Sequence, residues 1–380
     1  MRIYLDHNAT TPLRDEVLES MHRVLRDCFG NPSSSHAEGA AARRELVTAR
    51  ERVASLLHVA PREVIFTGSA TEANNSAIQG HLALAGGRRH LVTTCVEHPS
   101  VEEPMQVLEA MGAEVTRVPV DPEGRLDIAE LAAALRPDTA LLAVILANNE
   151  TGVLQDVPAI AEAAAARGVP LHVDATQAVG KVPVDVPALG ATTLSGTAHK
   201  LNGPKGAGFL IAHGPEALPP LVRGGPQERR RRGGTENLAG IVGLGVACEL
   251  ALRELPERAR RYAALRDRLW EGILAKVPAV RRNGSAERVL PNTLNLEFVA
   301  AAGEVLLEAL DGEGVAVSAG AACHSGSIEP SGVLLAMGRT PEQARSSLRL
   351  SVGLGVDEAQ VDRVIALLAE LVPRVRGIQA

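Results

Sequence analysis

The stretch TTLSGTAHKLNGPKGAG, residues Thr192–Gly208, organises our interpretation of the whole chain. Its beginning predicts a short strand, His199 and Lys200 fall on a polar turn, and its Gly/Pro-rich end predicts a hairpin into a second strand at 209–212. A lysine fixed on such a turn can form a Schiff base with a carbonyl compound, although it can also be a plain surface lysine. The chain has only four lysines, so each is a candidate for chemistry.

Strands and helices alternate on the N-terminal side of this stretch. The expected strands are Val64–Thr67, His90–Thr94, Glu114–Val118, Ala140–Leu146 and Pro170–Val173. The expected helices are Leu13–Cys28 with Thr11 as a cap, Ala37–Leu57, Ala70–Leu84, Pro99–Met111, Asp127–Leu135 and Val157–Arg167. Such alternation predicts an α/β fold whose mainly parallel sheet has helices on both faces and ligands beyond the carboxyl ends of its strands.

A second pattern follows the hairpin. We expect one helix from Asn237 to about Leu252 and a second, amphipathic helix from Pro256 to Ala275 that leads into a smaller α+β domain. The elements expected there are strands near Val280 and at Thr293–Phe298, Val315–Ser318 and Ser347–Val352, with helices at Glu304–Leu310 and Asp357–Leu371. We therefore expect a large domain at 13–255 and a small domain formed by 1–12 and 256–380.

Composition narrows the function classes. The 380 residues are 46% hydrophobic but only 2% aromatic, so small aliphatic residues must fill the core. A net charge of -6 argues against a nucleic-acid binder. The N-terminus does not resemble a signal peptide and no uncharged apolar run is long enough to span a bilayer, which favours a cytoplasmic protein without a membrane partner. The four cysteines form no CxxC pair, which argues against a metal site or a disulfide framework.

Polar groups end three of the predicted strands. The small and hydroxyl residues of Thr67–Glu72 stand where a strand meets a helix, so free backbone N–H groups there can hold a phosphate. Asp174 follows a strand and can pair with the protonated ring nitrogen of a pyridine cofactor, or simply cap a helix. His98 falls at the same edge of the sheet, although a lone histidine is more often structural.

These residues belong to motifs that together resemble the NifS-like cysteine desulfurases, a class V aminotransferase group within the fold type I pyridoxal-phosphate enzymes. The resemblance runs from Tyr4 to Arg349 through nine motifs in order. They are Leu5–Pro12, Gly30–Ser34, Ala70–Asn75, Glu97–His98, Asn148–Gly152, Asp174–Gln177, Ala198–Lys200, Gln227–Arg229 with Gly234–Asn237, and Ala322–Ser325. The family fold is a large domain with a mainly parallel seven-stranded sheet and a smaller α+β domain that carries a cysteine loop.

The resemblance implies a role for each matching position. Pyridoxal 5'-phosphate would be bound by Lys200 as a Schiff base, with Asp174 on its ring nitrogen, Gln177 on its ring hydroxyl and His98 stacked on the ring and assisting proton transfer. Its phosphate would be held by Ala70, Thr71, Thr197, His199 and Thr235. Thr235 would come from the second subunit of a homodimer. Substrate would be oriented by Asn31, Asn149 and Arg349, with Arg349 on its carboxylate, and Asn149 would also contact the cofactor.

Cys323 completes the implied chemistry. It lies in a small, polar, glycine-containing segment without an apolar period, where a thiol can be exposed and reactive. In the family reaction, the cysteine thiolate attacks the sulfur of L-cysteine, which leaves as L-alanine, and a persulfide remains on the enzyme. Sulfur then passes to an acceptor protein that serves iron-sulfur cluster assembly or tRNA thiolation.

Two positions depart from the desulfurase pattern. Thr197 replaces the usual serine and keeps its hydroxyl, whereas His324 follows Cys323 where threonine is common and gives the Cys-His-Ser sequence of selenocysteine lyases. The alternatives are therefore a selenocysteine lyase, another lyase or transaminase of the same fold, and a non-enzymatic binding platform. The presence of Lys200, Asp174, His98 and Cys323 argues against the last.

Overall fold

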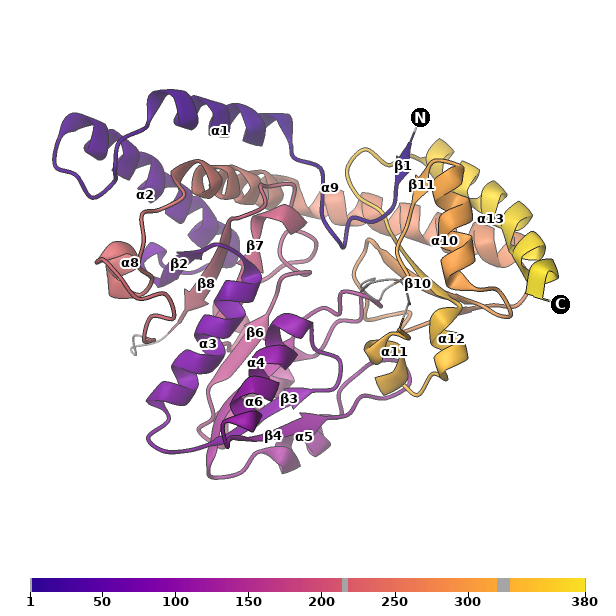
Figure 1. Ribbon diagram of the computed structural model, residues 1–380, viewed down its shortest axis with the longest axis horizontal. Coiled ribbons are helices and arrows are strands. Elements are labelled where there is room, and N and C mark those ends of the chain that lie inside the picture. The colour runs from indigo at the N-terminus through magenta and orange to yellow at the C-terminus, as the bar shows by residue number, and fades with distance from the viewer. Residues whose placement is uncertain (1, 214–217, 320–328, 380) are drawn as a thin grey trace.

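A computed structural model describes residues 2–213, 218–319 and 329–379 (Figure 1). Its larger sheet has seven strands in the order β2-β8-β7-β6-β5-β3-β4. These strands are β2 (Val64–Thr67), β3 (His90–Thr94), β4 (Glu114–Val118), β5 (Thr139–Ile145), β6 (Leu171–Asp174), β7 (Thr193–Thr197) and β8 (Gly208–Ala212). All neighbours are parallel except β8, which runs antiparallel to β7 and β2. The expected mainly parallel seven-stranded sheet is confirmed.

Helices cover both faces of this sheet because its strands are apolar on both sides. In β5, Leu141 and Ala143 pack in one core with α3 and α4, whereas Leu142 and Val144 belong to the core on the opposite face with α2, α6 and α9. The helices of this half are α1 (Asp15–Asp27), α2 (Ala37–Leu57), η1 (Pro61–Glu63), α3 (Ala70–Leu84), α4 (Pro99–Ala110), α5 (Ile128–Ala134), α6 (Val157–Ala165), α7 (Val186–Leu189), η2 (Ala198–Lys200) and α8 (Gln227–Arg230).

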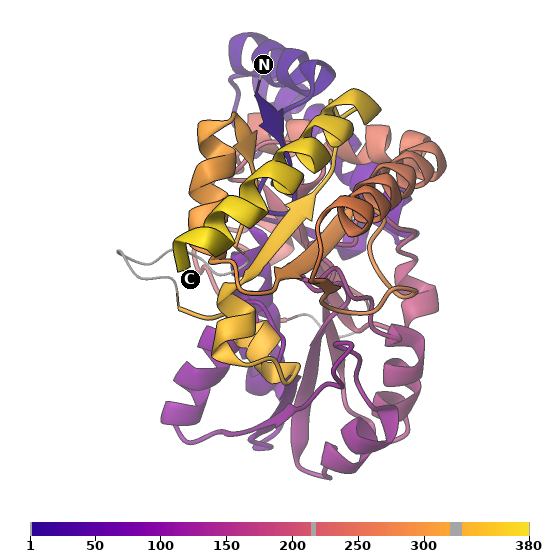
Figure 2. The same ribbon diagram turned by 90° about the vertical axis from the view of Figure 1, so that its right-hand side faces the viewer.

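A smaller half lies beside the first, at the right of Figure 1 and in front in Figure 2. It contains an antiparallel sheet of order β12-β10-β9 and a parallel pair, β1 with β11. Its elements are β1 (Ile3–Tyr4), β9 (Val280–Arg282), β10 (Thr293–Phe298), α10 (Gly303–Gly312), β11 (Val315–Ala316), α11 (Gly332–Ala336), α12 (Pro341–Arg345), β12 (Ser347–Ser351) and α13 (Glu358–Gln379). A separate apolar core joins its sheet to α13 and to residues of the N-terminal strand. These two cores support the domain division near residue 255, which we keep as a proposal.

One long helix, α9 (Leu238–Lys276), connects the two cores (Figure 1). We expected two helices that met near Pro256, and this expectation was wrong. Proline removes one backbone N–H and therefore leaves the carbonyl of Leu252 without its helical partner. Leu252 is 41% exposed, so water can satisfy that carbonyl, while both flanks of the helix are held by burial in the two cores. None of the described helices is long and apolar enough to cross a membrane.

The start of α1 also differs from the expectation. The helix begins at Asp15, its N-cap is Arg14, and no side chain caps it. Thr11 does not serve as a helix cap. Its hydroxyl donates to the carbonyl of His199 at 2.8 Å and accepts from the backbone N–H of Asn202 at 2.8 Å. The N-terminal segment is thereby tied to the turn that carries Lys200.

Two short helices, α11 and α12, were not expected. They are too brief to show a helical period, but the start of α12 does carry a local signal. Thr340 and Gln343 form a capping box around Pro341 at the first helical position. Both helices pack on the large half, because Val333, Leu334 and Ala344 share a small core with Val96 and Ile145.

Gly208, the first residue of β8, sets how closely the sheet approaches α3. A Cβ atom added there would lie 2.6 Å from the carbonyl carbon of Ser69 and 3.0 Å from the nitrogen of Ala70. Both are backbone atoms that cannot rotate away. We predict that Gly208→Ala lowers the free energy of unfolding by roughly 1–3 kcal/mol through overpacking, as measured by denaturant unfolding.

Gly312→Ala is the matched control, because Gly312 ends α10 and a Cβ there meets nothing within 4 Å. We expect this variant to unfold at the same denaturant concentration as the parent or slightly higher. Equal behaviour of the two variants would contradict the close approach of β8 and α3.

Candidate active site

A cavity of about 370 Å³ lies at the carboxyl ends of the central strands, where the two halves meet. Its lining contains most of the residues that the sequence predicts for the site. They are Ala70, Thr71, His98, Asn149, Asp174, Gln177, Thr197, His199, Lys200 and Arg349. Residues that had no predicted role also line it, namely Asn8, Ala9, Ser69, Ser100, Ile145, Thr176 and Ser318.

The N-terminus of α3 forms one end of this cavity. Ser69 caps the helix, with its hydroxyl accepting from the backbone N–H of Glu72 at 3.1 Å. Ala70 and Thr71 occupy the first turn, whose N–H groups have no helical acceptor and stand at the positive end of the helix dipole. Thr197, whose hydroxyl donates to the carbonyl of Ala207 at 3.0 Å, lines the same cavity. This end of the cavity favours an anionic group.

A hydrogen-bonded chain of buried side chains leads from Asp174 to His98. The amide of Asn74 donates to Asp174 Oδ2 at 2.8 Å and to Ser100 Oγ at 2.8 Å. Ser100 Oγ lies 2.8 Å from His98 Nδ1. Asn74 and Ser100 were missed as site residues, although both fall within or beside quoted motifs, because nothing in sequence spacing reveals that α3 and α4 contact each other at this edge.

Behind Asp174, His172 fixes the orientation of Asn74. Because the Asn74 amide nitrogen donates to Asp174, its oxygen faces His172 Nε2 at 2.9 Å, and that nitrogen must therefore carry a proton. Burial lowers the pKa of His172 to about 3, so this ring is neutral near pH 7. The hydrogen-bond partners of Asp174 are thus neutral amide groups, namely the Asn74 side chain and the backbone N–H of Thr176.

His98 is the N-cap of α4 and is held as one tautomer. Its Nδ1 accepts from the backbone N–H of Ser100 at 3.0 Å, so in the neutral ring the proton is on Nε2. Burial is the main cause that lowers the pKa of His98 below its usual value, while Asp174 opposes this and Lys200 adds to it. His98 is therefore a neutral donor at Nε2 near pH 7.

Lys200 ends the short helix η2 and is partly buried in the wall of the cavity. The Nζ atom donates to the backbone carbonyls of Asn8 and Ala9, at 2.5 and 2.7 Å. The pKa of Lys200 is lowered to about 8, mainly by burial and in part by the charge of Arg349, whereas Asp6 and Asp174 oppose the shift. A useful fraction of this amine is thus uncharged and nucleophilic near neutral pH.

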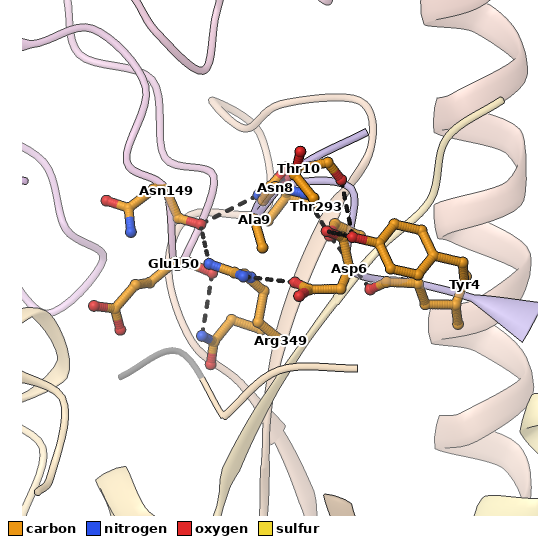
Figure 3. A network of polar contacts seen from close by, with 12 residues as sticks. Tyr4, Asp6, Asn8, Ala9, Thr10, Asn149, Glu150, Thr293 and Arg349 are labelled. Atoms are coloured by element: carbon orange, nitrogen blue, oxygen red, sulfur yellow. Dashed lines mark hydrogen bonds and ion pairs between the residues drawn. The ribbon is translucent and has the colours of Figure 1, made fainter. Parts of the chain in front are cut away.

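Arg349 reaches the cavity from β12 in the smaller half (Figure 3). Its Nη2 pairs with Asp6 at 2.7 Å and its Nη1 donates to the carbonyl of Asn149 at 3.0 Å. The Nε atom is buried and has no partner among the described residues. A guanidinium that is oriented in this way retains N–H groups for an anionic ligand in the cavity.

Asn8 joins three parts of the site and was the largest omission of the sequence analysis. Its side-chain nitrogen donates to the carbonyl of Asn149 and to Thr293 Oγ1, at 3.2 and 2.9 Å (Figure 3). Its own carbonyl accepts from Lys200 and from Gln177. The motif Leu5–Pro12 contains this residue, but its contacts depend on a meeting of distant segments.

Cys323 lies outside the described residues, but the chain on both sides of it is anchored near the cavity. Before it, Ser318 exchanges backbone hydrogen bonds with Arg349 at 2.7 and 3.1 Å. After it, the hydroxyl of Ser331 donates to Glu150 Oε2 at 2.5 Å. Burial raises the pKa of Glu150 to about 7, while Ser331 and Arg349 oppose that shift.

Two predicted residues do not line the cavity of their own chain. Asn31 is exposed after α1, where its side chain accepts from the backbone of Ser33 at 2.9 Å. Thr235 is also exposed, just before α9. Among the other cysteines, Cys248 is buried, whereas Cys28 is only half-buried.

The chain resembles known proteins over its whole length. Residues 3–364 match the family described as Aminotransferase class-V. It is 46% identical to a cysteine desulfurase of Enterobacter agglomerans over 377 residues, which cover 99% of this chain and 94% of that protein. It is 42% identical to cysteine desulfurase IscS of Dictyoglomus turgidum over 377 residues, or 99% and 96% of the two chains.

Solved structures agree with the sequence relatives. A NifS-like protein superposes with a TM-score of 0.93 at 36% identity and covers 98% of this chain and 100% of its own. A structure described as SspA in complex with cysteine gives a TM-score of 0.82 at 34% identity, over 93% and 99% of the two chains. The protein therefore belongs to the aminotransferase class-V family of fold type I enzymes, in the group of the cysteine desulfurases.

Proposed function

We propose that the protein is a pyridoxal-phosphate-dependent enzyme that converts L-cysteine to L-alanine and transfers the sulfur to Cys323. The observation that carries this proposal is the Lys200 amine, which shares one cavity with Asp174 and with the N-terminus of α3. Its lowered pKa, of about 8, suits an amine that must react with an aldehyde. The full-length resemblance to cysteine desulfurases supports the choice of substrate.

The residues of the cavity fit pyridoxal phosphate as a set. Asp174 is 2% exposed and accepts hydrogen bonds only from amide groups among the described residues, which suits a protonated ring nitrogen, and the first turn of α3 suits the phosphate. Gly208 allows that turn to approach the sheet, since a Cβ would collide with it. When bound, the cofactor supplies an aldehyde for the amine and a ring that stabilises negative charge on the substrate Cα.

The two basic groups of the cavity divide the proton transfers between them. Lys200 Nζ, with its pKa lowered to about 8, is the group that can remove a proton from the substrate Cα. His98 carries its proton at Nε2, because Nδ1 accepts from the backbone of Ser100. We therefore propose that His98 donates a proton and contacts the cofactor ring, and that Lys200 acts as the base.

Arg349 is proposed to bind the carboxylate of the substrate. Asp6 and the carbonyl of Asn149 hold two of its nitrogens, so the guanidinium is oriented before substrate arrives. The remaining N–H groups of Nη1 and Nη2 are available for a carboxylate. Asn149 lines the same cavity and would contact both cofactor and substrate.

The sulfur transfer is assigned to Cys323. Its thiolate attacks the substrate sulfur, an S–S bond forms as the Cβ–S bond breaks, and the electron pair of the broken bond remains with Cβ, which takes up a proton to give alanine. The anchored positions of Ser318 and Ser331 support this assignment, because both flanks of the segment are tied to residues at or beside the cavity. An acceptor protein for iron-sulfur cluster assembly or tRNA thiolation would then remove the sulfur.

Alanine release from L-cysteine and from L-selenocysteine, measured side by side, tests the function. The parent protein loaded with pyridoxal phosphate is expected to release alanine from cysteine, and Cys323→Ala is expected to lose this activity by at least about a thousandfold, because it removes the only proposed nucleophile. Cys248→Ala is the control, since Cys248 is buried in α9 away from the cavity.

Alanine release from selenocysteine distinguishes the second candidate function, a selenocysteine lyase, from a cysteine desulfurase. The Cys-His-Ser sequence at 323–325 is similar to that of selenocysteine lyases and favours this candidate. In such a lyase, selenium can leave without a protein thiol. Alanine from selenocysteine alone, unaffected by Cys323→Ala, would establish that lyase. No alanine from either substrate, without cofactor binding, would reject the proposed function.

We further propose a homodimer in which Thr235 binds the cofactor phosphate of the partner subunit. Thr235 is exposed and absent from the cavity of its own chain, which supports a role in trans. The turn before it is held in place by a buried ion pair, since Arg50 contacts Glu228 at 2.6 and 2.8 Å. That pair keeps Glu228 and Arg229 in left-handed backbone conformations, with φ of 46° and 56°.

Hybrid dimers test the role in trans. We predict that mixed and refolded Lys200→Ala and Thr235→Ala subunits regain activity at a cofactor concentration too low to load the Thr235→Ala parent. One site of the hybrid would then be intact and the other doubly defective. If each threonine served its own subunit, no site would be intact, and the mixture would show only the average alanine release of its two parents.

A further inference from the structure

Lys181 is a buried lysine that the proposed mechanism does not use. It lies four residues after Gln177 in the turns that follow β6, is 4% exposed, and its Nζ contacts only amide oxygens among the described residues: Gln177 Oε1 at 2.6 Å and Asn8 Oδ1 at 3.1 Å. No described carboxylate pairs with it. A buried ammonium without a counter-ion is unfavourable, and burial lowers the pKa of Lys181 well below its usual value, with further lowering by Lys200 and Arg349.

This lysine determines which way the Gln177 amide faces. A lysine amine near an amide donates to the oxygen, so Gln177 Oε1 is committed to Lys181 and its NH2 group must occupy the other position. There Nε2 donates one hydrogen to the carbonyl of Asn8 at 2.8 Å. The reversed amide would set the Gln177 oxygen against the carbonyl oxygen of Asn8 and lose the hydrogen bond between them. Gln177 lines the cavity, so the second hydrogen of Nε2 is left for a ligand.

Asn8, the other hydrogen-bond partner of Lys181, is also held by several hydrogen bonds. Its Oδ1 accepts from Lys181 and from Asn292 Nδ2 at 3.0 Å, and its carbonyl accepts from Gln177 and Lys200. Lys181, Asn8 and Gln177 therefore form a closed triangle in which each hydrogen bond fixes the next. The triangle joins the N-terminal segment to the turn after β6. The Asn8 carbonyl also contacts the reactive amine of Lys200.

We propose that Lys181 is a positioning residue that locks the Gln177 amide with an N–H directed toward the ring oxygen of the cofactor. This inference rests on the proposed cofactor and extends the predicted role of Gln177 to the residue that controls it. A donor at the ring oxygen stabilises its negative charge and competes with the proton shared between that oxygen and the Lys200 nitrogen. Loss of the donor therefore makes the proton harder to remove.

Lys181 can act on the cofactor through its hydrogen bond to Gln177 and through any positive charge that it carries, and losing either has an effect of the same sign. Removing its donor releases the Gln177 amide, and removing any positive charge near the cavity also favours the protonated form. The midpoint of the pH-dependent change in visible absorption should rise in either case. The other titratable or charged groups facing this region are Asp6, His7, His98, Asp174, His199, Lys200 and Arg349, and the test leaves all of them unchanged.

The test is a pH titration of visible absorption in the loaded protein. Lys181→Met is expected to raise the midpoint by roughly one pH unit, the size of one lost hydrogen bond, and to weaken pyridoxal phosphate binding to the cofactor-free protein severalfold. Lys276→Met is the matched control, because Lys276 is exposed at the end of α9. It should leave both the midpoint and the affinity unchanged.

A double-mutant comparison separates positioning from a general structural effect. If Lys181 acts through Gln177, Lys181→Met should shift the midpoint more in the parent than in a Gln177→Ala background. Should Lys181→Met fail to fold, Gln177→Glu provides the same test of the donor. Its carboxylate keeps the contact with Lys181 but offers no hydrogen to the ring oxygen, so the midpoint should again rise.

An unchanged midpoint in Lys181→Met, or equal shifts in the parent and Gln177→Ala backgrounds, would overturn the inference. These outcomes are distinguishable from failure of the proposed function, because that failure would leave the parent protein without a visible absorption band. A parent that is yellow and titrates normally, beside a Lys181→Met variant that behaves identically, rejects only the role of Lys181.

Discussion

The removal of the Lys200 amine from water is the constraint on which the site depends. An ammonium group is stable in bulk water, and burial penalises its charged form. In this protein the backbone carbonyls of Asn8 and Ala9 replace the water, which leaves the amine ordered and its pKa near 8. Those carbonyls belong to the N-terminal segment, which is tied to the Lys200 turn by Thr11 and to the smaller half by β1. Reactivity therefore depends on the docking of one short segment.

Charged groups of both signs line the cavity around this amine. Asp174 is buried behind neutral partners, Asn74 and His172, so its carboxylate charge is directed toward the cavity. Arg349 is held by Asp6 and comes from the other half of the molecule. The cavity thus has a negative wall for a protonated ring, a positive helix terminus for a phosphate and a guanidinium for a carboxylate. These groups come from both halves of the molecule, each with its own apolar core.

The sequence predicted the strands and long helices well, because their apolar periods are strong and their ends carry caps or glycines. The ligand-facing residues of the large half were also predictable, since strand ends of a parallel sheet meet at one edge. Contacts between distant segments could not be predicted from the sequence. Asn8, Asn74 and Lys181 gain their roles only when folded neighbours meet, and Pro256 failed as a helix breaker because the packing of α9 outweighs one lost hydrogen bond.

Borohydride reduction of the protein loaded with pyridoxal phosphate, followed by peptide mapping, tests the central claim most directly. Reduction makes the bond between cofactor and lysine permanent, and the chain has only four lysines to distinguish. The account predicts that the cofactor is found on the peptide that contains Lys200, and that Lys200→Ala carries none. Labelling at Lys181, or at an exposed lysine with Lys200 unmodified, would contradict it.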